Sequence, residues 1–230
     1  MCDLRFTIYD WKTDSKPRLK HRSKIAKLKS HILILILLLA GTAFSQQPAA
    51  DDLKNEFGIF AGYSPVNVQG IGITSDRDLF LLNLQYARVL GSTENTTLKY
   101  TAAVVPVAFV NQPAELFQPS TGSVYILPRK RFYGGGIDPV GFQWNFRRQR
   151  AWQPFLNTQG GFLYFTDQVP VPESSQFNFT FSFGAGVQVF RGTRAMTLGY
   201  KFHHISNAQT GHYNPGIDSN LFYLGWSFLR

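Results

Sequence analysis

The chain contains a single cysteine, Cys2, and it has no long apolar segment after residue 45. A single cysteine excludes a disulfide framework. Because Cys2 lies in the N-terminal segment that we expect to be removed, no lipid-anchored cysteine is expected in the mature chain. A membrane-spanning helix needs ~20 consecutive apolar residues, so no such helix is expected beyond residue 45. Aromatic residues are nevertheless abundant, with 21 Phe, 10 Tyr and 4 Trp among 230 residues. These features together predict strands that are apolar on one side only.

Residues 1–45 have the composition of a secretory signal peptide. Positions 1–30 carry nine Lys or Arg residues against three Asp residues, a net charge of +6, and a short apolar run follows. The sequence Ala43-Phe44-Ser45 then resembles a cleavage site. We expect residues 1–45 to be removed, with an uncleaved anchor as the alternative, and residues 46–55 to form a short periplasmic leader. Only +3 of the total charge of +9 lies beyond residue 45, so the high isoelectric point does not indicate nucleic-acid binding.

Eight later segments have strand-like composition or alternation, and the connections between them are alternately long and short. The pattern is clearest in residues 177–190, where phenylalanine at every odd position from 177 to 183 alternates with Asn, Thr and Ser. The segments are residues 56–64, 79–90, 96–110, 132–146, 152–166, 177–190, a segment that ends at Ser206 and one from Asp218 to Phe228.

Strands that are apolar outside and polar inside, with short turns at one end and longer loops at the other, are typical of outer-membrane barrels. Unpaired strand edges are not tolerated in hydrocarbon, so the sheet has to close. We therefore predict an all-β fold, an eight-stranded antiparallel transmembrane β-barrel of the outer membrane, formed by residues 56–230. Side chains fill the interior of a barrel of this size, so a pore is not expected.

Three residue types that together activate a nucleophile lie near the C-terminus. Alternation places His204 and Ser206 on one face of the seventh strand, with their Cα atoms roughly 7 Å apart, and Asp218 begins the neighbouring strand. A serine needs a base to take its proton, and the base needs a carboxylate to orient it. With the N-terminus in the periplasm, all three would lie at the extracellular end and point toward lipid. The substrate would then be an outer-leaflet molecule, chiefly lipopolysaccharide; the alternative is that His204 and Ser206 simply begin a solvated loop.

Residues 203–223 resemble the C-terminal hairpin of the outer-membrane lipid A 3-O-deacylases, the PagL family. The similarity rests on the run from His204 to Ala208 and on an acidic residue twelve positions after the serine. It implies a serine-type carboxylic ester hydrolase with Ser206 as nucleophile, His204 as general base and acid, Asp218 as the orienting acid and Asn207 at the oxyanion site. It implies neither a metal nor an organic cofactor. One departure is that the family pattern has Glu at the acid position, where Asp218 is one methylene shorter.

Other assignments remain open at this point. His203 has inward parity and is expected to form hydrogen bonds inside the barrel, while His212 is expected in a solvated loop; a metal site formed by both with His204 lacks convincing ligand geometry. A non-catalytic barrel for adhesion or envelope integrity, using the connection 111–131, is one rival function, and a phospholipase or acyltransferase is another. The expected partners are lipopolysaccharide or lipid A and other membrane lipids, and whether the chain forms a homodimer is left open.

Overall fold

A computed structural model describes residues 53–65, 67–118 and 124–230. The predicted signal peptide, residues 1–45, and most of the predicted leader, residues 46–55, lie outside these ranges. No helix in the described part of the chain is long and apolar enough to cross a membrane.

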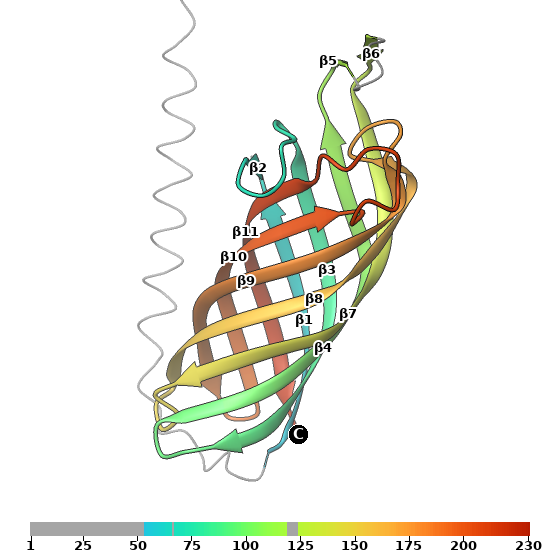
Figure 1. Ribbon diagram of the computed structural model, residues 1–230. Coiled ribbons are helices and arrows are strands. Elements are labelled where there is room, and N and C mark those ends of the chain that lie inside the picture. The colour runs from blue at the N-terminus through green and yellow to red at the C-terminus, as the bar shows by residue number, and fades with distance from the viewer. Residues whose placement is uncertain (1–52, 66, 119–123) are drawn as a thin grey trace, which may run out of the picture. The chain divides into compact units, whose positions relative to one another are not determined.

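Eight long strands of the described chain form one antiparallel sheet, and each pairs with the next in sequence (Figure 1). The first strand also pairs with the last, so the sheet closes into a barrel. This confirms the predicted fold class. The strands are β1 (Asn55–Ser64), β3 (Asp78–Ser92), β4 (Thr96–Gln112), β7 (Lys130–Phe146), β8 (Trp152–Val169), β9 (Ser175–Arg191), β10 (Arg194–Ser206) and β11 (Ile217–Leu229).

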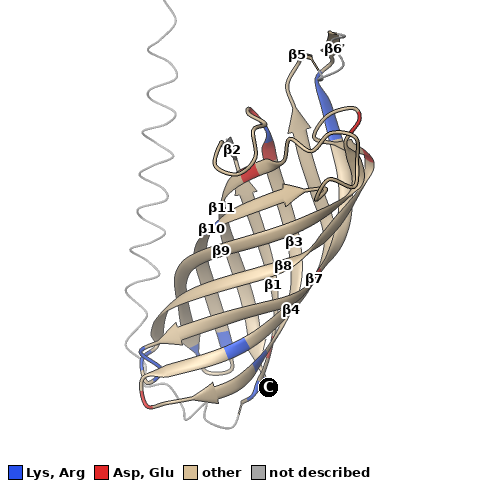
Figure 2. Cartoon of the chain, in the orientation of Figure 1, with Lys and Arg blue, Asp and Glu red and all other residues tan. Residues whose placement is uncertain are grey.

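The outer surface of the barrel is an apolar belt. In β9, Phe181 and Phe183 are 39% and 53% exposed, whereas the intervening Ser182 is buried. The same alternation continues around the barrel and exposes one or more large apolar side chains on every strand, including Ile59, Leu84, Val104, Phe142, Leu156, Leu198 and Leu224. Charged residues gather at the two ends of the barrel (Figure 2). Such a surface is suited to hydrocarbon between two polar boundaries.

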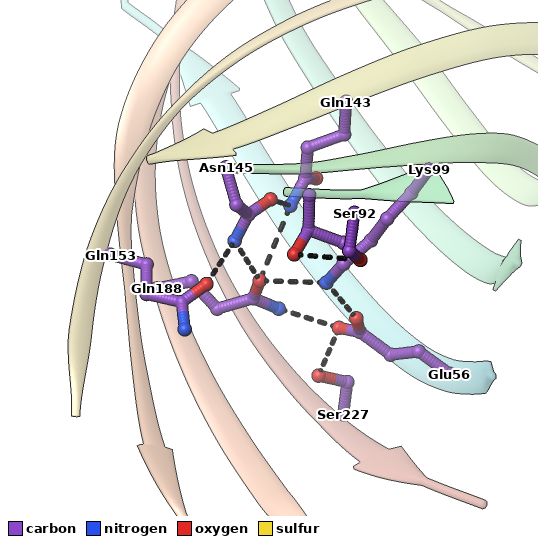
Figure 3. Close-up of polar contacts among 9 residues, drawn as sticks. Glu56, Ser92, Lys99, Gln143, Asn145, Gln153, Gln188 and Ser227 are labelled. Carbon is purple, nitrogen blue, oxygen red and sulfur yellow. Dashed lines mark hydrogen bonds and ion pairs between the residues drawn. The ribbon is translucent and has the colours of Figure 1, made fainter. Parts of the chain in front are cut away.

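The interior is filled by two different kinds of side chain. Toward the end of the barrel where Asn55 and Arg230 lie, Lys99 Nζ contacts Glu56 Oε2 at 2.6 Å, and Gln188 and Ser227 donate to the same carboxylate (Figure 3). Toward the other end the interior is mixed. Leu79, Val110, Phe132, Leu163, Phe165, Ile205 and Leu221 form one buried apolar cluster, and the buried polar residues Asn178 and Thr180 pair with Leu163 and Ile205 of that cluster. The apolar cluster was not predicted, while the inward polar residues of β9 were.

The two ends of the barrel differ in their connections. Short turns at residues 93–95, 147–151 and 192–193 lie at the end where Asn55 and Arg230 exchange backbone hydrogen bonds. The opposite end has the connections 65–77, 113–129 and 207–216, as well as a connection 170–174 that is shorter than predicted.

Secondary structure in the long connections was not predicted. The connection between β4 and β7 contains the paired strands β5 (Glu115–Phe117) and β6 (Tyr125–Leu127). A two-residue strand, β2 (Asn67–Val68), pairs with β11 at Asp218 and Ser219. Since β1 pairs with β11 only as far as Phe222, β2 replaces β1 as the neighbour of β11 at this end.

Candidate active site

His204 and Asp218 are joined across two neighbouring strands. They are direct partners in the register of β10 and β11, a position in which the Cβ atoms of paired residues are about 4.5–5.5 Å apart. His204 Nδ1 lies 2.5 Å from Asp218 Oδ1. The shorter aspartate arm therefore reaches the imidazole, because the two residues stand directly opposite each other.

The second carboxylate oxygen of Asp218 is held by three consecutive backbone N–H groups. Gly70, Ile71 and Gly72 donate to Oδ2 at 2.8, 2.5 and 2.8 Å. Successive N–H groups that converge in this way form an anion-binding nest. With Oδ2 accepting three bonds, Oδ1 is the oxygen that remains for the imidazole, so the orientation of the carboxylate is set by the loop and not by Asp218 alone.

The nest depends on close backbone packing between two loops. A Cβ added to Gly72 would lie 2.8 Å from the carbonyl carbon of Gly216, and Gly216 itself has a φ of +63°. A side chain at either position would separate the loops or strain the backbone. The nest was not predicted from the sequence because its donors are main-chain groups. Gly70 and Gly72 are the only residues in its sequence that could have indicated it.

The loop changes the exposure of the predicted triad. Asp218 belongs to the outer face by register, as predicted, but it is fully buried, because residues 70–72 cover it. The prediction that the Asp218 carboxylate is exposed to lipid is therefore wrong, although its predicted side of the sheet is right. The His204 side chain is 13% exposed, and Ser206 is half-buried. Ile71 is 63% exposed, so the cover presents an apolar side chain outward.

Ser206 ends β10 on the same face as His204 and pairs with Phe179 of β9. His204 Nδ1 is engaged by Asp218, which leaves Nε2 for a second partner. No hydrogen bond joins Ser206 to His204 within the described ranges. The serine–histidine contact therefore stays a prediction, and such bonds are often long before substrate binds.

Asn207 is committed to the loop that follows Ser206. Its backbone N–H donates to Asn214 Oδ1 at 3.0 Å, and its side-chain amide donates to the Tyr213 carbonyl at 2.8 Å. Its Oδ1 accepts from the Gln209 N–H, and the side chain is 1% exposed. These bonds brace a loop in which Ala208 and Gln209 both have positive φ. They give the proposed oxyanion role of Asn207 no support, and that role stays a prediction.

The described part of the chain contains two further histidines, His203 and His212. His203 points into the barrel and is 2% exposed, as predicted, but neither ring nitrogen has a hydrogen-bond partner in the described structure. The expected interior hydrogen bond is therefore wrong. His212 is exposed in the loop between β10 and β11. The described residues contain no group of three or more side chains suited to hold a metal ion.

Aromatic rings border the imidazole on the outer face. The Phe181 ring centroid lies 6.3 Å from those of His204 and Phe202, and Phe202 lies 5.2 Å from Phe183. On the far side of Phe181, its register partner Gly160 leaves a shallow gap, since an added Cβ there would meet only a carbonyl oxygen, 3.8 Å away. An apolar chain could lie against these rings.

Comparison with known proteins gives one match at the level of family. A family model described as lipid A 3-O-deacylase (PagL) matches residues 74–227. The crystal structure of the outer membrane enzyme PagL is similar to this chain with a TM-score of 0.54 and 17% identity, over 73% of this chain and 97% of that one. Neisserial surface protein A (TM-score 0.46, 12% identity, 76% and 96% covered) and Ail of Yersinia pestis (0.39, 16%, 77% and 100%) are also similar. No curated protein matches the sequence.

Proposed function

The chain belongs to the lipid A 3-O-deacylase (PagL) family, and from this premise we propose that it hydrolyses the ester-linked hydroxyacyl chain at the 3-position of lipid A in the bacterial outer membrane. Ser206 is the nucleophile, His204 the general base and acid, and Asp218 the orienting carboxylate. The observation that carries the proposal is the 2.5 Å contact between His204 and Asp218, on the same barrel face as Ser206 and at the end of the barrel with the long connections.

The proposed reaction uses these three groups in two steps. Ser206 Oγ attacks the ester carbonyl carbon while His204 Nε2 takes its proton, and Asp218 Oδ1 stabilises the imidazolium that forms. The bond between the carbonyl carbon and the sugar oxygen then breaks, and His204 returns the proton to that oxygen. Water, deprotonated by His204, attacks the acyl-enzyme, releases the hydroxy fatty acid and restores Ser206.

The surroundings of His204 support an acyl substrate held at the membrane surface. Phe181, Phe183 and Phe202 give the outgoing chain an aromatic surface that continues into the apolar belt. The ester of a lipid lies between its polar head and its hydrocarbon, which is the level at which a reactive group at the loop end of β10 would meet it. A glycolipid in the outer leaflet would therefore reach Ser206 without leaving the membrane.

Mass spectrometry of lipopolysaccharide incubated with the refolded protein tests the proposal. We expect the wild-type protein to remove one hydroxyacyl unit, and we expect Ser206→Ala to reduce the rate by about 10³-fold or more. Ser219→Ala is the matched control, since this buried serine next to Asp218 has no hydrogen-bond partner for its hydroxyl in the described structure; it should keep its activity. The proposal fails if the wild-type protein leaves lipid A intact or if Ser206→Ala is equally active.

The same assay separates the rival functions. A barrel for adhesion or envelope integrity would leave the lipid unchanged in every variant. A phospholipase would release fatty acid from glycerophospholipid vesicles and leave lipid A intact.

A further inference from the structure

Two arginines stand directly opposite each other at the turn between β9 and β10. Arg191 and Arg194 are register partners across a two-residue connection in which Gly192 has a φ of +59°. A hydrogen bond from the Leu229 N–H to the Thr193 carbonyl, at 2.7 Å, holds the turn from the side of β11. Residues paired in this way have Cβ atoms about 4.5–5.5 Å apart. The two guanidinium groups therefore share one short stretch of the outer surface.

Neither arginine is neutralised within the described chain. Both residues are exposed, and neither side chain forms an ion pair or a hydrogen bond there. The anions that the structure describes at this end of the barrel are Glu56, Glu94 and the C-terminal carboxylate, and Glu56 is buried beside Lys99. Like charges directly opposite each other destabilise a sheet. The pair is therefore suited to an external anion that both arginines can contact.

A row of apolar side chains lies next to the arginine pair, two residues farther from the turn. Its members are direct neighbours in register across β8, β9, β10 and β11: Trp152, Val189, Met196 and Trp226. Both tryptophans and the methionine are exposed, and the row continues into the apolar belt. Tryptophan is enriched at the level where hydrocarbon meets the lipid headgroups, so the row marks this level on the barrel.

A guanidinium group lies against each tryptophan of this row. Arg147 Cζ is 3.5 Å from the centroid of the Trp152 ring, and Arg194 Cζ is 5.9 Å from that of Trp226. A guanidinium over an aromatic face is attracted by the ring quadrupole, and its N–H groups at the edge stay available as donors. The rings therefore hold both cations at the headgroup level, where they can donate to a phosphate.

The charge around the site also favours an anion. Figure 2 shows Lys and Arg on several strand ends and turns at the end of the barrel that carries the short turns. Besides the arginines already named, Lys54, Arg88, Arg148 and Arg150 lie at this end. Short turns of outer-membrane barrels face the periplasm. The arginine pair therefore lies at the inner leaflet of the outer membrane.

We propose that Arg191 and Arg194 bind the phosphate of an anionic phospholipid of the inner leaflet, with Arg147 as a third cation beside them. A guanidinium pairs with phosphate oxygens through two parallel N–H donors, and the two strands supply one guanidinium each. The acyl chains of the lipid lie along the row from Trp152 to Trp226. The inference does not depend on the proposed function, because the pair lies at the opposite end of β9 and β10 from the level of His204.

Quenching of tryptophan fluorescence by brominated lipids tests the proposal. The protein is refolded into phosphatidylcholine vesicles that contain dibrominated phosphatidylglycerol or, at the same mole fraction, dibrominated phosphatidylcholine. The described tryptophans, Trp144, Trp152 and Trp226, are exposed and lie near this end of the barrel, so quenching reports the lipid next to the site. We expect the wild-type protein to prefer phosphatidylglycerol about fivefold, the effect of one engaged cation, and Arg191→Gln together with Arg194→Gln to bring the preference below about twofold.

Arg131→Gln is the matched control. Arg131 is also exposed and lies 4.8 Å from the centroid of an aromatic ring, that of Phe109, but it belongs to the opposite end of the barrel. This variant should keep the wild-type preference. Equal quenching of the wild-type protein by the two lipids would overturn the inference, as would a double variant with the same preference as Arg131→Gln.

Thermal unfolding in detergent micelles separates lipid binding from a role in the fold. In a neutral detergent without phospholipid, the double variant should be at least as stable as the wild type, because like charges no longer face each other. Added phosphatidylglycerol should then raise the Tm of the wild type more than that of the double variant. A double variant that is less stable without phospholipid, or an equal rise in Tm for both proteins, would overturn the inference. Neither measurement needs turnover, so a protein that leaves lipid A intact would refute the proposed function alone.

Discussion

Replacing Asp218 with asparagine should remove activity by reversing the hydrogen bond to His204. The amide has one oxygen, and the three N–H groups of residues 70–72 face the position of Oδ2. The amide oxygen therefore occupies that position, and the NH₂ group turns toward His204 Nδ1. The imidazole then accepts at Nδ1 and carries its proton on Nε2, the nitrogen that has to take the proton of Ser206.

The size of the effect follows from the role of the carboxylate. The corresponding aspartate-to-asparagine change in the serine protease triad lowers kcat about 10⁴-fold, which corresponds to about 5 kcal/mol of transition-state free energy. The loop also loses charge-assisted bonds. A hydrogen bond to a charged group contributes about 1.5–3 kcal/mol and a neutral one about 0.5–1.5 kcal/mol, so three weakened bonds cost up to about 4 kcal/mol locally. The eight paired strands do not depend on these bonds.

The assay is the rate of hydroxyacyl release, measured together with the gel mobility of the unheated protein as a test of barrel folding. Asp78→Asn is the control, because Asp78 is also a carboxylate at this end of the barrel and accepts a bond from the Tyr63 hydroxyl. It should remain active. Activity of Asp218→Asn within about threefold of the wild type, in a folded barrel, would show that the carboxylate does not orient the imidazole.

Two further substitutions test features described above. Gly72→Ala places a methyl group 2.8 Å from the Gly216 carbonyl carbon, so it should displace the nest and lower turnover about tenfold or more in a folded barrel. Gly91→Ala is the control, because the space around its added carbon is open, and it should have no effect on turnover. Equal turnover rates of the two variants would contradict the role of the nest. Lys99→Met removes the only cation paired with the buried Glu56 in the described structure, leaving its hydrogen bonds from Gln188 and Ser227. It should lower the free energy of unfolding by about 3–5 kcal/mol, measured by urea titration, and the double replacement Glu56→Leu with Lys99→Met should recover part of the loss. A Lys99→Met variant as stable as the wild type would contradict this prediction.

The barrel could be predicted because alternation is a local property of each strand. Phe181 faces outward and Ser182 inward for reasons present in their own segment, and the register of β10 with β11 then places His204 opposite Asp218. Prolines were harder to interpret. Proline commonly interrupts a strand, yet β8 is continuous through Pro154, which pairs with Val187 of β9. The register of β8 with β7 ends at Phe155, so Pro154 lies where no hydrogen bond to β7 is needed. Pro106, by contrast, coincides with a register shift between β4 and β7, where a missing N–H is tolerated.

The environment of the site could be predicted only in part. The contact between His204 and Asp218 depends on side-chain type and strand parity, and both are visible in the sequence. The burial of Asp218 depends on where residues 70–72 place their main-chain N–H groups. No side chain in that loop indicates this position. The role of Asn207 depends on the path of the loop after Ser206, where Ala208 and Gln209 adopt positive φ, a conformation that neither residue type predicts.

The side chains inside the barrel affect how permeable a membrane that contains this protein would be. A hydrophilic solute entering the barrel from the end with the long connections would meet the buried apolar cluster around Phe165 and then the ion pair between Glu56 and Lys99. Many copies of such a barrel would therefore add little to the permeability of a membrane to polar solutes.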